Sequence, residues 1–482
     1  MNVLFLNPPF FDNFSRSQRS PAVTKSGTLY YPIWLSLAAG VLMKEGFNVC
    51  LVDAVAQRIN NKNLIKKIKE FNPKLLVVDT STPSIYNDIN IAAECKKNVP
   101  NCFVVLVGPH VSVLAEETLE NNMEIDALAR GEYDYTIRDL AVVIKKRKML
   151  ESVEGLSFRR GMKIIHNPQR SKIQNLDALP FVSRVYKQFL DVKKYFFAAA
   201  NYPEVQIFTA RGCPFNCFFC VYPQVMHGNA YRVRSPDNVV EEFDFIARNF
   251  PSVKEVVIED DTFTVDQRRV ESICDKLIKK KNRLFWNANV RADLDIGLMR
   301  KMKEAGCRLV ITGFESGEQK ILNNIGKGIT IEQSEEFFQN ARKAKLLVHA
   351  ALMAGNPGED KKTLEKTFSL AKKGFPDTVQ FFPLIVYPGT KAFQWAQKNN
   401  FLKTVDYQQW VTKEGLHNCL VDLPDISAQD MVNWCNDSRR KYYLNLKYIF
   451  YKIFQMVRYP REIKRTVKAG LKFSKHLLTF KK

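Results

Sequence analysis

The feature that most constrains the fold is a repeated alternation of short apolar segments with helical patterns. Within the first 145 residues, five strand-like segments are separated by amphipathic stretches. These segments read NVLFLN, NVCLVDA, KLLVVDT, FVVLVG and DALARG, at residues 2–7, 48–54, 74–80, 103–108 and 126–131. Strands that follow one another through helices favour a parallel sheet with crossover connections. We therefore predict an α/β protein that begins with a Rossmann-like open parallel sheet.

The alternation resumes near residue 204 with longer helices between the strands. Further strands are predicted at 204–210, 255–260, 284–290, 308–315, 347–355 and 379–386. Six strand–helix units without a reversal predict a partial (β/α)6 barrel, where chemistry is expected at the C-terminal ends of the strands. A hairpin pattern and a linker separate the two parts. The predicted domains are 1–148, a hairpin and linker at 149–200, a barrel at 201–395, and a helical region with a basic tail at 396–482.

The net charge of +22 is concentrated at the C-terminus, where residues 439–482 hold fourteen Lys and Arg and one acidic residue. Tyr, Phe, Ile and Leu are interleaved with these charges, a pattern typical of basic amphipathic helices on anionic membrane surfaces. A helical end packed on the enzyme remains an alternative. Nucleic acid, which basic segments bind through its phosphates, is a less favoured partner because the tail carries so many bulky apolar side chains.

The predicted compartment is the cytoplasm, with peripheral contact at the inner face of the membrane. No signal-peptide pattern opens the chain, and the longest apolar stretch, at 32–43, falls short of the about 20 residues that span a bilayer. Seven of the ten cysteines are scattered, which fits a reducing environment better than a disulfide framework.

The remaining three cysteines form a cluster in the segment TARGCPFNCFFC, directly after the first predicted barrel strand. Cys213, Cys217 and Cys220 occur within eight positions. Structural zinc prefers four ligands, and His227 is the only nearby candidate to complete such a set. Plain core packing is the other alternative. An iron–sulfur cluster on three thiolates, with one iron left open for a ligand, is the interpretation that we favour.

This segment resembles the signature C-x3-C-x-aromatic-C of the radical SAM superfamily, with Phe219 as the aromatic residue. The resemblance implies a [4Fe-4S] cluster that binds S-adenosylmethionine (SAM) and cleaves it reductively to a 5′-deoxyadenosyl radical, with flavodoxin or ferredoxin as electron donor. It continues through IEDDTFT, WNANVRAD, GFESG, MAGNPGED and YPGT, each at a predicted strand end. The SAM-binding residues that it implies are Phe219, Asp260, Asp261, Asn289, Arg291, Glu315, Ser316 and Tyr387.

The N-terminal part resembles the cobalamin-binding module that precedes this barrel in one large subfamily. The motif D-x-H-x-x-G is absent, so His110, which stands in VGPHVS, is not a lower axial ligand by pattern, and Pro109 replaces a common glycine. The resemblance implies cobalamin bound without an axial histidine; a ligand-free scaffold is the alternative. The cobalamin-binding residues implied at the strand ends are Asn7, Pro8, Asp53, Thr80, Ser81, Gly108, His110, Gly131 and Glu132.

Together, these resemblances imply a cobalamin-dependent radical SAM enzyme that methylates an unactivated carbon. Cobalamin-assisted rearrangement, cyclisation or ring contraction remains open. The basic tail resembles those of members that act on membrane lipids, including hopanoid-associated enzymes, so we expect a lipid, isoprenoid or lipid-linked substrate. A methylthiotransferase acting on transfer RNA is less favoured, because Cys50, Cys95 and Cys102 are too scattered for a second cluster. A non-catalytic cobalamin or iron–sulfur sensor is the last alternative.

Overall fold

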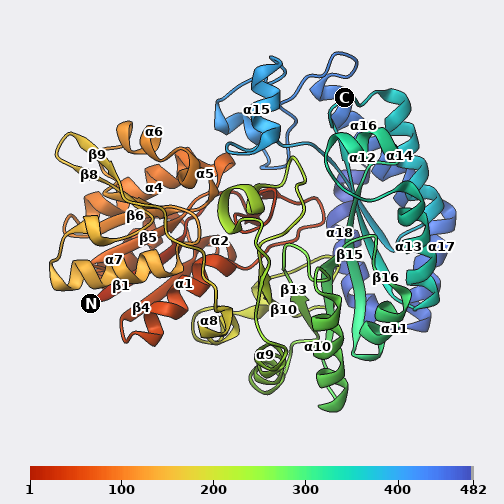
Figure 1. The fold of residues 1–482 in the computed structure, drawn as a ribbon, viewed down its shortest axis with the longest axis horizontal. Coiled ribbons are helices and arrows are strands. Elements are labelled where there is room, and N and C mark those ends of the chain that lie inside the picture. Colours follow the sequence, from red (N-terminus) through yellow and green to blue (C-terminus); the bar gives the residue numbers. More distant parts are fainter. Residues whose placement is uncertain (479–482) are drawn as a thin grey trace.

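The computed structural model describes residues 1–478, with side chains through Lys472. It contains two sheets side by side and a helical C-terminal region (Figure 1). The first sheet has the strand order β4-β1-β5-β6-β7-β8-β9. Its strands are β1 (Asn2–Asn7), β4 (Asn48–Asp53), β5 (Leu75–Asp79), β6 (Phe103–Val107), β7 (Ala127–Ala129), β8 (Leu156–Arg160) and β9 (Lys163–His166).

The five strands β1, β4, β5, β6 and β7 pair in parallel, which confirms the predicted N-terminal sheet. The hairpin β8–β9 adds two antiparallel strands to the edge of this sheet. Short segments β2 (Phe14–Ser15) and β3 (Ala22–Val23) pair separately. The surrounding helices are α1 (Ile33–Lys44), α2 (Ala54–Gln57), α3 (Asn61–Phe71), α4 (Ile85–Asn98), α5 (Pro109–Val113), α6 (Ala115–Glu120), α7 (Asp134–Lys146) and the one-turn η1 (Thr82–Ser84).

The second sheet is fully parallel and follows chain order, as the predicted barrel requires. Its strands are β10 (Glu204–Ile207), β13 (Glu255–Ile258), β14 (Phe285–Val290), β15 (Cys307–Glu315), β16 (Leu347–Ala354) and β17 (Thr378–Pro383). Figure 1 shows helices along its outer side. These helices are α9 (Pro236–Asn249), α10 (Gln267–Lys279), α11 (Ile296–Glu304), α12 (Gln319–Asn324), α13 (Ile331–Lys343) and α14 (Lys361–Gly374).

Polar residues mark where the longer barrel helices begin. Ser235, Asp266, Asp295, Thr330 and Asp360 each precede a helix and accept a hydrogen bond from a backbone N–H in its first turn. Such a side chain satisfies a donor that has no partner within the helix. All five of these helices therefore begin with the same interaction, a side-chain oxygen that accepts a hydrogen bond from the first turn.

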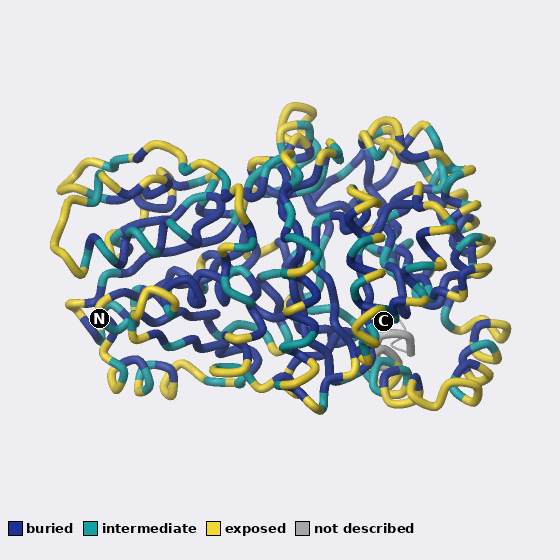
Figure 2. The backbone as a smooth tube through the Cα atoms, turned by 60° about the horizontal axis from the view of Figure 1, so that its bottom comes forward, coloured by how far each residue is buried: buried dark blue, intermediate teal, exposed yellow. Residues whose placement is uncertain are grey.

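Helix α1 joins the two halves of the molecule. Its residues Leu35 and Leu42 belong to the core around the first sheet, whereas Leu37 and Val41 belong to the core around the barrel. Helix α8 (Val182–Phe189), in the connecting segment, packs against it. The two cores are thus continuous across this helix. Figure 2 shows the result, with buried backbone running through both halves and exposed residues mainly on outer helices and loops.

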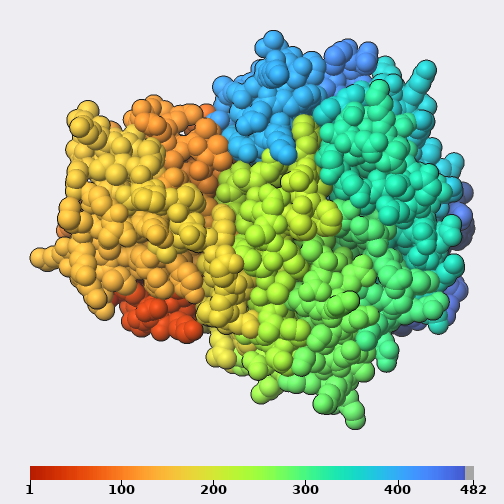
Figure 3. All heavy atoms as spheres, viewed as in Figure 1, coloured from red at the N-terminus to blue at the C-terminus, as the bar shows by residue number. Residues whose placement is uncertain are grey.

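The C-terminal region begins with α15 (Lys391–Lys398) and the short η6 (Tyr407–Trp410), which lie over the junction of the two halves (Figure 3). Three helices follow: α16 (Ala428–Tyr443), α17 (Leu446–Arg458) and α18 (Arg461–Leu478). Helix α16 packs on β17, and Glu462 at the start of α18 pairs with Arg308 at 3.3 Å. The predicted basic tail therefore packs on the barrel as far as it is described; residues 479–482 lie outside the described residues.

Among the described residues, the helices are all too short or too polar to cross a membrane.

Candidate functional site

The three clustered cysteines lie on a loop between β11 (Ala210–Arg211) and the single-turn π-helix η5 (Tyr222–His227). All three line one cavity of about 670 Å³. The loop begins at Gly212, whose φ of +85° favours glycine. A Cβ atom there would lie 2.2 Å from the carbonyl oxygen of Ala230, so the chain passes too closely for a side chain.

The cysteine loop is held in place by backbone and side-chain hydrogen bonds. Gln224 Nε2 donates to the carbonyl oxygens of Cys217, Phe218 and Cys220, at 3.3, 3.1 and 2.9 Å.

Burial raises the pKa of the Cys213 and Cys220 thiols, and the neighbouring Cys217 raises both further because like charges repel. The loop thus holds three thiols within electrostatic reach of one another in one wall of the cavity.

This donor set fits an iron–sulfur cluster, because thiolates are the ligands that such clusters take. His227, the candidate fourth zinc ligand, is turned toward Asp261 with 3.0 Å between Nδ1 and Oδ2, and its ring stacks on Tyr222. Within the part of the chain that the structure describes, no group of three His, Cys, Asp or Glu side chains is placed to hold a single metal ion, as a zinc site would require. A four-iron cluster takes each thiolate on a different iron, so the cysteine loop does not need to converge on one point.

Six of the eight residues predicted to bind SAM line the same cavity as the cysteines. They are Phe219, Asp261, Asn289, Arg291, Glu315 and Tyr387. Asp260 and Ser316 do not line it. Asp260 instead accepts hydrogen bonds from the backbone N–H and the hydroxyl of Thr209, both at 2.5 Å, and Ser316 lies 3.2 Å from the hydroxyl of Thr367. These two side chains hold strand ends together next to residues that reach the cavity.

The polar groups in the cavity leave acceptors for a ligand. Glu315 pairs with Lys327 at 2.7 Å through Oε1, while its buried Oε2 has no hydrogen-bond partner among the described residues. Its φ of +63° is rare for a residue with a side chain and is the kind of strain found at ligand sites. Burial alone would raise the pKa of Asp261, but His227 and Arg19 hold it below its ordinary value. A ligand that carries amine and hydroxyl donors, as SAM does, fits these carboxylates.

Arg291 is oriented beside the cysteine loop by several contacts. Its guanidinium lies 3.6 Å from the ring centroid of Phe215 and 3.1 Å from Asp293, and it donates to the carbonyl oxygen of Gly328 at 2.8 Å. Cation–π contact and ion pairing together restrict the orientation of the side chain.

The residues predicted to bind cobalamin lie at the carboxyl edge of the first sheet and outside this cavity. Several of them bond to one another or to neighbouring strands. Asn7 donates to Asp53 at 2.9 Å, and Asp53 also accepts from the hydroxyl of Tyr195 at 2.8 Å. Arg16 donates to Asn7 at 2.8 Å and forms a buried ion pair with Asp88. The strand pattern did not indicate a role at this edge for Arg16, Asp88 or Tyr195, because their partners are distant in sequence.

The other strand ends of this sheet are covered by η1 and η6. Arg16 also donates to the carbonyl oxygen of Pro8, Thr80 donates to that of Val107, and the hydroxyls of Ser81 and Ser84 share a hydrogen bond. Gly108, with a φ of +126°, precedes α5, in which the ring of His110 packs against Tyr407 of η6.

Two buried donors near this edge have no partner among the described residues: the hydroxyl of Tyr133 and the indole nitrogen of Trp410. Unpaired buried donors are costly and call for a ligand that can accept hydrogen bonds. The amide side groups of a corrinoid provide such acceptors, so the residues present fit cobalamin.

Glu132 and its neighbour Gly131 lie where the first sheet meets the barrel. Glu132 pairs with Arg232 at 2.5 Å and with Arg211 at 3.6 Å, and Arg211 also pairs with Asp134 at 2.8 Å. All four side chains are buried. Burial would raise the pKa of Glu132, but the two guanidinium groups lower it to about 2. Arg232 belongs to β12 (Arg232–Val233), which pairs with the strand before the cysteine loop, so this network connects the N-terminal sheet to that loop.

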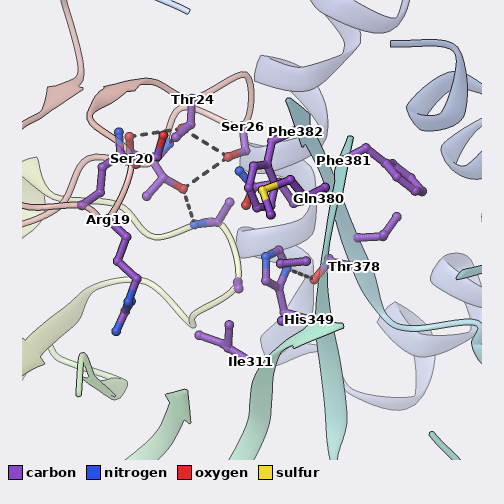
Figure 4. Close-up of a pocket in the computed structure, with 18 of the residues that line it drawn as sticks. Arg19, Ser20, Thr24, Ser26, Ile311, His349, Thr378, Gln380, Phe381 and Phe382 are labelled. Carbon is purple, nitrogen blue, oxygen red and sulfur yellow. Dashed lines mark hydrogen bonds between the residues drawn. The ribbon is translucent and has the colours of Figure 1, made fainter. Parts of the chain in front are cut away.

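Two walls of the cavity had no counterpart among the predicted site residues. The first is the segment on either side of β3, which contributes Arg19, Ser20, Thr24 and Ser26 (Figure 4). The second comes from the C-terminal helices and includes Tyr443, Tyr448, Ile449, Lys452, Ile453, Met456 and Arg465. Between them lie β16 and β17, with His349, Thr378, Gln380 and Phe382 facing the space in Figure 4.

Comparison with known proteins agrees with both halves of this description. A model of the radical SAM superfamily matches residues 207–371, and a model of the B12 binding domain matches residues 19–141. An uncharacterized methyltransferase of Pyrococcus horikoshii is 31% identical over 430 residues, which cover 89% of this chain and 91% of that protein. The hopanoid C-3 methylase of Methylococcus capsulatus is a distant relative, 22% identical over 404 residues that cover 83% of this chain and 74% of that enzyme.

Two solved structures share the fold over most of the chain. OxsB, a cobalamin-dependent SAM radical enzyme solved with aqua-cobalamin and SAM bound, superposes with a TM-score of 0.71 at 15% identity, covering 96% of this chain and 71% of OxsB. The methyltransferase TsrM of Kitasatospora setae superposes with a TM-score of 0.67 at 18% identity, covering 84% of this chain and 77% of TsrM. Both contain the sheet and barrel arrangement described above.

Proposed function

Because this chain belongs to the B12-binding radical SAM enzymes, whose cofactors are a [4Fe-4S] cluster, SAM and cobalamin, we propose that it methylates an unactivated carbon of a lipid, isoprenoid or lipid-linked substrate. One observation carries this proposal. The three cysteines open into the same cavity as a wall of apolar side chains from β16, β17 and the C-terminal helices. The similarity to the Pyrococcus methyltransferase supports the reaction type.

In this proposal, Cys213, Cys217 and Cys220 hold the cluster, and the carboxylates of Asp261 and Glu315 receive the polar groups of SAM. The carboxyl edge of the first sheet, next to the unpaired Tyr133 hydroxyl, holds cobalamin. When bound, these groups supply one-electron cleavage of SAM and a transferable methyl group.

The protein's own contribution is to position the reactants and keep water out of the cavity. Segments from the N-terminus, the barrel and the C-terminal helices enclose the space together, and much of its lining is apolar. Exclusion of water protects a reactive centre from side reactions and strengthens the electrostatic contacts inside. The buried ion pairs of Glu132 hold the first sheet against the cysteine loop, and so keep the two cofactor sites in a constant relation.

Helix α17 supports a lipid-associated substrate. Leu446, Phe450, Phe454 and Val457 are each at least 60% exposed and recur at helical spacing, so they form one apolar face. Basic side chains are interspersed along α17 and α18, and a bilayer with anionic lipids matches both the charge and the apolar face. The proposal therefore includes peripheral binding at the membrane surface.

Vesicle flotation tests this part. The protein is expected to float with vesicles of phosphatidylcholine and phosphatidylglycerol and less with phosphatidylcholine alone. F450S/F454S should abolish flotation, whereas Met162→Ser, an exposed apolar residue in the β8–β9 turn, should not. Flotation of F450S/F454S at the wild-type level would refute membrane docking through α17.

The main test is anaerobic purification from cobalamin-fed cells, followed by measurement of iron, sulfide and cobalt. Wild type should contain about four irons and one cobalt, and C213A/C217A/C220A should lose the iron while keeping the cobalt. Cys50→Ala, a cysteine outside the cavity, serves as the control and should keep both. Iron retained by the triple variant would contradict the assignment of the cluster ligands.

The reaction type is tested with a lipid extract, a strong reductant and SAM. Methyl transfer should produce 5′-deoxyadenosine and S-adenosylhomocysteine together, with label from the SAM methyl group in a lipid product. Deoxyadenosine with no S-adenosylhomocysteine would favour rearrangement or cyclisation over methyl transfer.

A further inference from the structure

The charges that line the large cavity are unevenly matched. Among the described lining residues, Asp261 and Glu315 are the only acids. The basic side chains that line it are Arg19, Lys25, Arg291, Lys327, Arg439, Lys452 and Arg465. Five of these seven have a carboxylate within 4.0 Å, and the pairs are Arg19–Glu259, Arg291–Asp293, Lys327–Glu315, Lys452–Asp377 and Arg465–Glu462. Lys25 and Arg439 have none among the described residues.

Lys25 and Arg439 come from opposite ends of the sequence and meet at one neutral side chain. The ammonium of Lys25 and the guanidinium of Arg439 both donate to Asn436 Oδ1, at 2.5 and 2.6 Å. Arg439 also donates to the carbonyl oxygen of Phe381 at 2.7 Å. Asn436 and Arg439 lie one turn apart on α16, and Lys25 lies in the turn between Thr24 and Ser26.

Two half-buried cations on one uncharged acceptor are unfavourable without a counter-charge. The pKa values of both groups reflect this situation. Burial and the neighbouring Arg439 lower the pKa of Lys25 to about 8, and burial lowers the pKa of Arg439. Neither acid of the described lining neutralises this pair. Asp261 follows the end of β13, and Glu315 is already paired with Lys327.

Apolar side chains lie on one side of the pair. Figure 4 shows the Thr24–Ser26 turn close to Phe382, with Ile311 further along the same space, while Arg19 points away from both. Arg19 itself pairs with Glu259 at 3.4 Å and donates to the carbonyl oxygen of Asp260 at 2.6 Å. The cavity therefore presents a cationic site next to an apolar surface and separate from the cysteines.

We propose that Lys25 and Arg439 bind an anionic oxygen group, a phosphate or a carboxylate, at one end of a substrate whose apolar body lies along Phe382 and Ile311. This assignment rests on the proposed function and narrows its substrate class from lipids in general to anionic amphiphiles. The pair is a binding and orienting element: anchoring the charged end determines which carbon of the apolar body reaches the cysteine side.

Titration calorimetry of the cofactor-loaded enzyme with octyl phosphate, octanoate, octanol and inorganic phosphate tests the assignment. Octyl phosphate or octanoate should bind more tightly than octanol. K25Q and R439Q should each weaken binding of the charged probe by about tenfold to a hundredfold, the loss typical of a charge-assisted hydrogen bond. R439K, which keeps the charge, should bind more tightly than R439Q. Lys398→Gln, which changes an exposed lysine outside the cavity, should have no effect.

Variants that contain iron and cobalt at wild-type levels are taken as folded. If substitutions of Arg439 in α16 prevent folding, K25Q still tests the proposal, because Lys25 lies on a loop. Equal binding of octanol and octyl phosphate, no binding of either charged probe, or unchanged binding by both neutral variants would overturn the proposal. Inorganic phosphate that binds as tightly as octyl phosphate would overturn the amphiphile and leave a simple anion site. Binding is measured without turnover, so this test does not depend on methyl transfer. If the proposed methyl transfer fails, the binding results still support or refute the anion site.

Discussion

Replacing Glu132 with Gln tests the view that this residue joins the two halves of the molecule. Its carboxylate is buried between Arg232 and Arg211, at 2.5 and 3.6 Å. The pKa lowered from 4.5 to about 2 corresponds to about 3 kcal/mol of folding free energy at neutral pH. Breaking a buried ion pair typically costs about 3–5 kcal/mol, in agreement with that value. We expect E132Q to lose about 3 kcal/mol at pH 7.

The pH dependence has a definite sign. The pKa of Glu132 is lower in the folded protein, so its contribution is complete above pH 4.5 and is lost as the pH falls toward 2. The difference between wild type and E132Q in urea-unfolding free energy should therefore shrink below about pH 4.5. E132Q/R232Q should be less destabilised than the sum of its single variants.

The control is Glu154→Gln, an exposed acid 3.9 Å from Arg170, which should change stability by less than about 1 kcal/mol. A loss below about 1 kcal/mol for E132Q at pH 7, or a loss unchanged in acid, would refute the reasoning. If E132Q loses cobalt but keeps its stability, the result would instead favour direct binding of cobalamin by Glu132.

Three further outcomes follow from the structure. Burial raises the pKa of Glu359 from 4.5 to about 7, so its contribution to stability is complete below pH 4.5 and lost as pH rises through 7; thermal-unfolding midpoints of E359Q should vary less between pH 5 and 8 than those of wild type. Tyr195→Phe removes a buried donor 2.8 Å from Asp53 and should cost about 1–3 kcal/mol in urea unfolding; no loss would contradict that contact. Gly212→Ala should lose most of its iron, because the added methyl group meets a carbonyl oxygen at 2.2 Å, whereas Gly46→Ala, at a similar φ with open space, should keep it.

The strands and their order could be predicted because both sheets are built from short, nearly uniform apolar runs. The segment predicted at 2–7 is β1 (Asn2–Asn7), and the polar residues after each run lie at the strand ends of the structure. Parallel strands buried on both faces leave this continuous apolar signal, and capping residues mark the helices that follow. The cysteine motif was equally local, since its three residues occupy one loop.

The orientation of neighbouring side chains was harder to predict. Asp260 and Asp261 are adjacent, and both matched the motif, yet only Asp261 lines the cavity while Asp260 binds the backbone at Thr209. Likewise, Glu315 lines the cavity, whereas the neighbouring Ser316 contacts the hydroxyl of Thr367. Successive residues at a strand end point in opposite directions, and sequence does not say which direction faces the ligand.

The charge of the tail was an incomplete guide to its role. Lys452 and Arg465 were counted with the surface charge, but both are buried and line the cavity. The pair of Lys452 with Asp377 and the contact between Lys25 and Asn436 connect positions that are far apart in sequence, so no local pattern indicates them. Arg465 pairs with Glu462 one turn earlier on α18, but Glu462 is buried there because it also pairs with the distant Arg308. Up to Lys472, where the described side chains end, the exposed apolar residues of the basic segment lie mainly on one face of α17 and α18.

The C-terminal helices close the cavity without contributing a strand to either sheet. Substitutions of Ile449, Ile453 and Met456, which line the cavity from α17, are therefore expected to change the shape of the reaction chamber without changing the cysteine loop. In evolutionary terms, this gives the chain an exchangeable specificity module at its end. A change of substrate is therefore expected to require replacements at the cavity-lining positions of α16, α17 and α18, while Cys213, Cys217 and Cys220 stay the same.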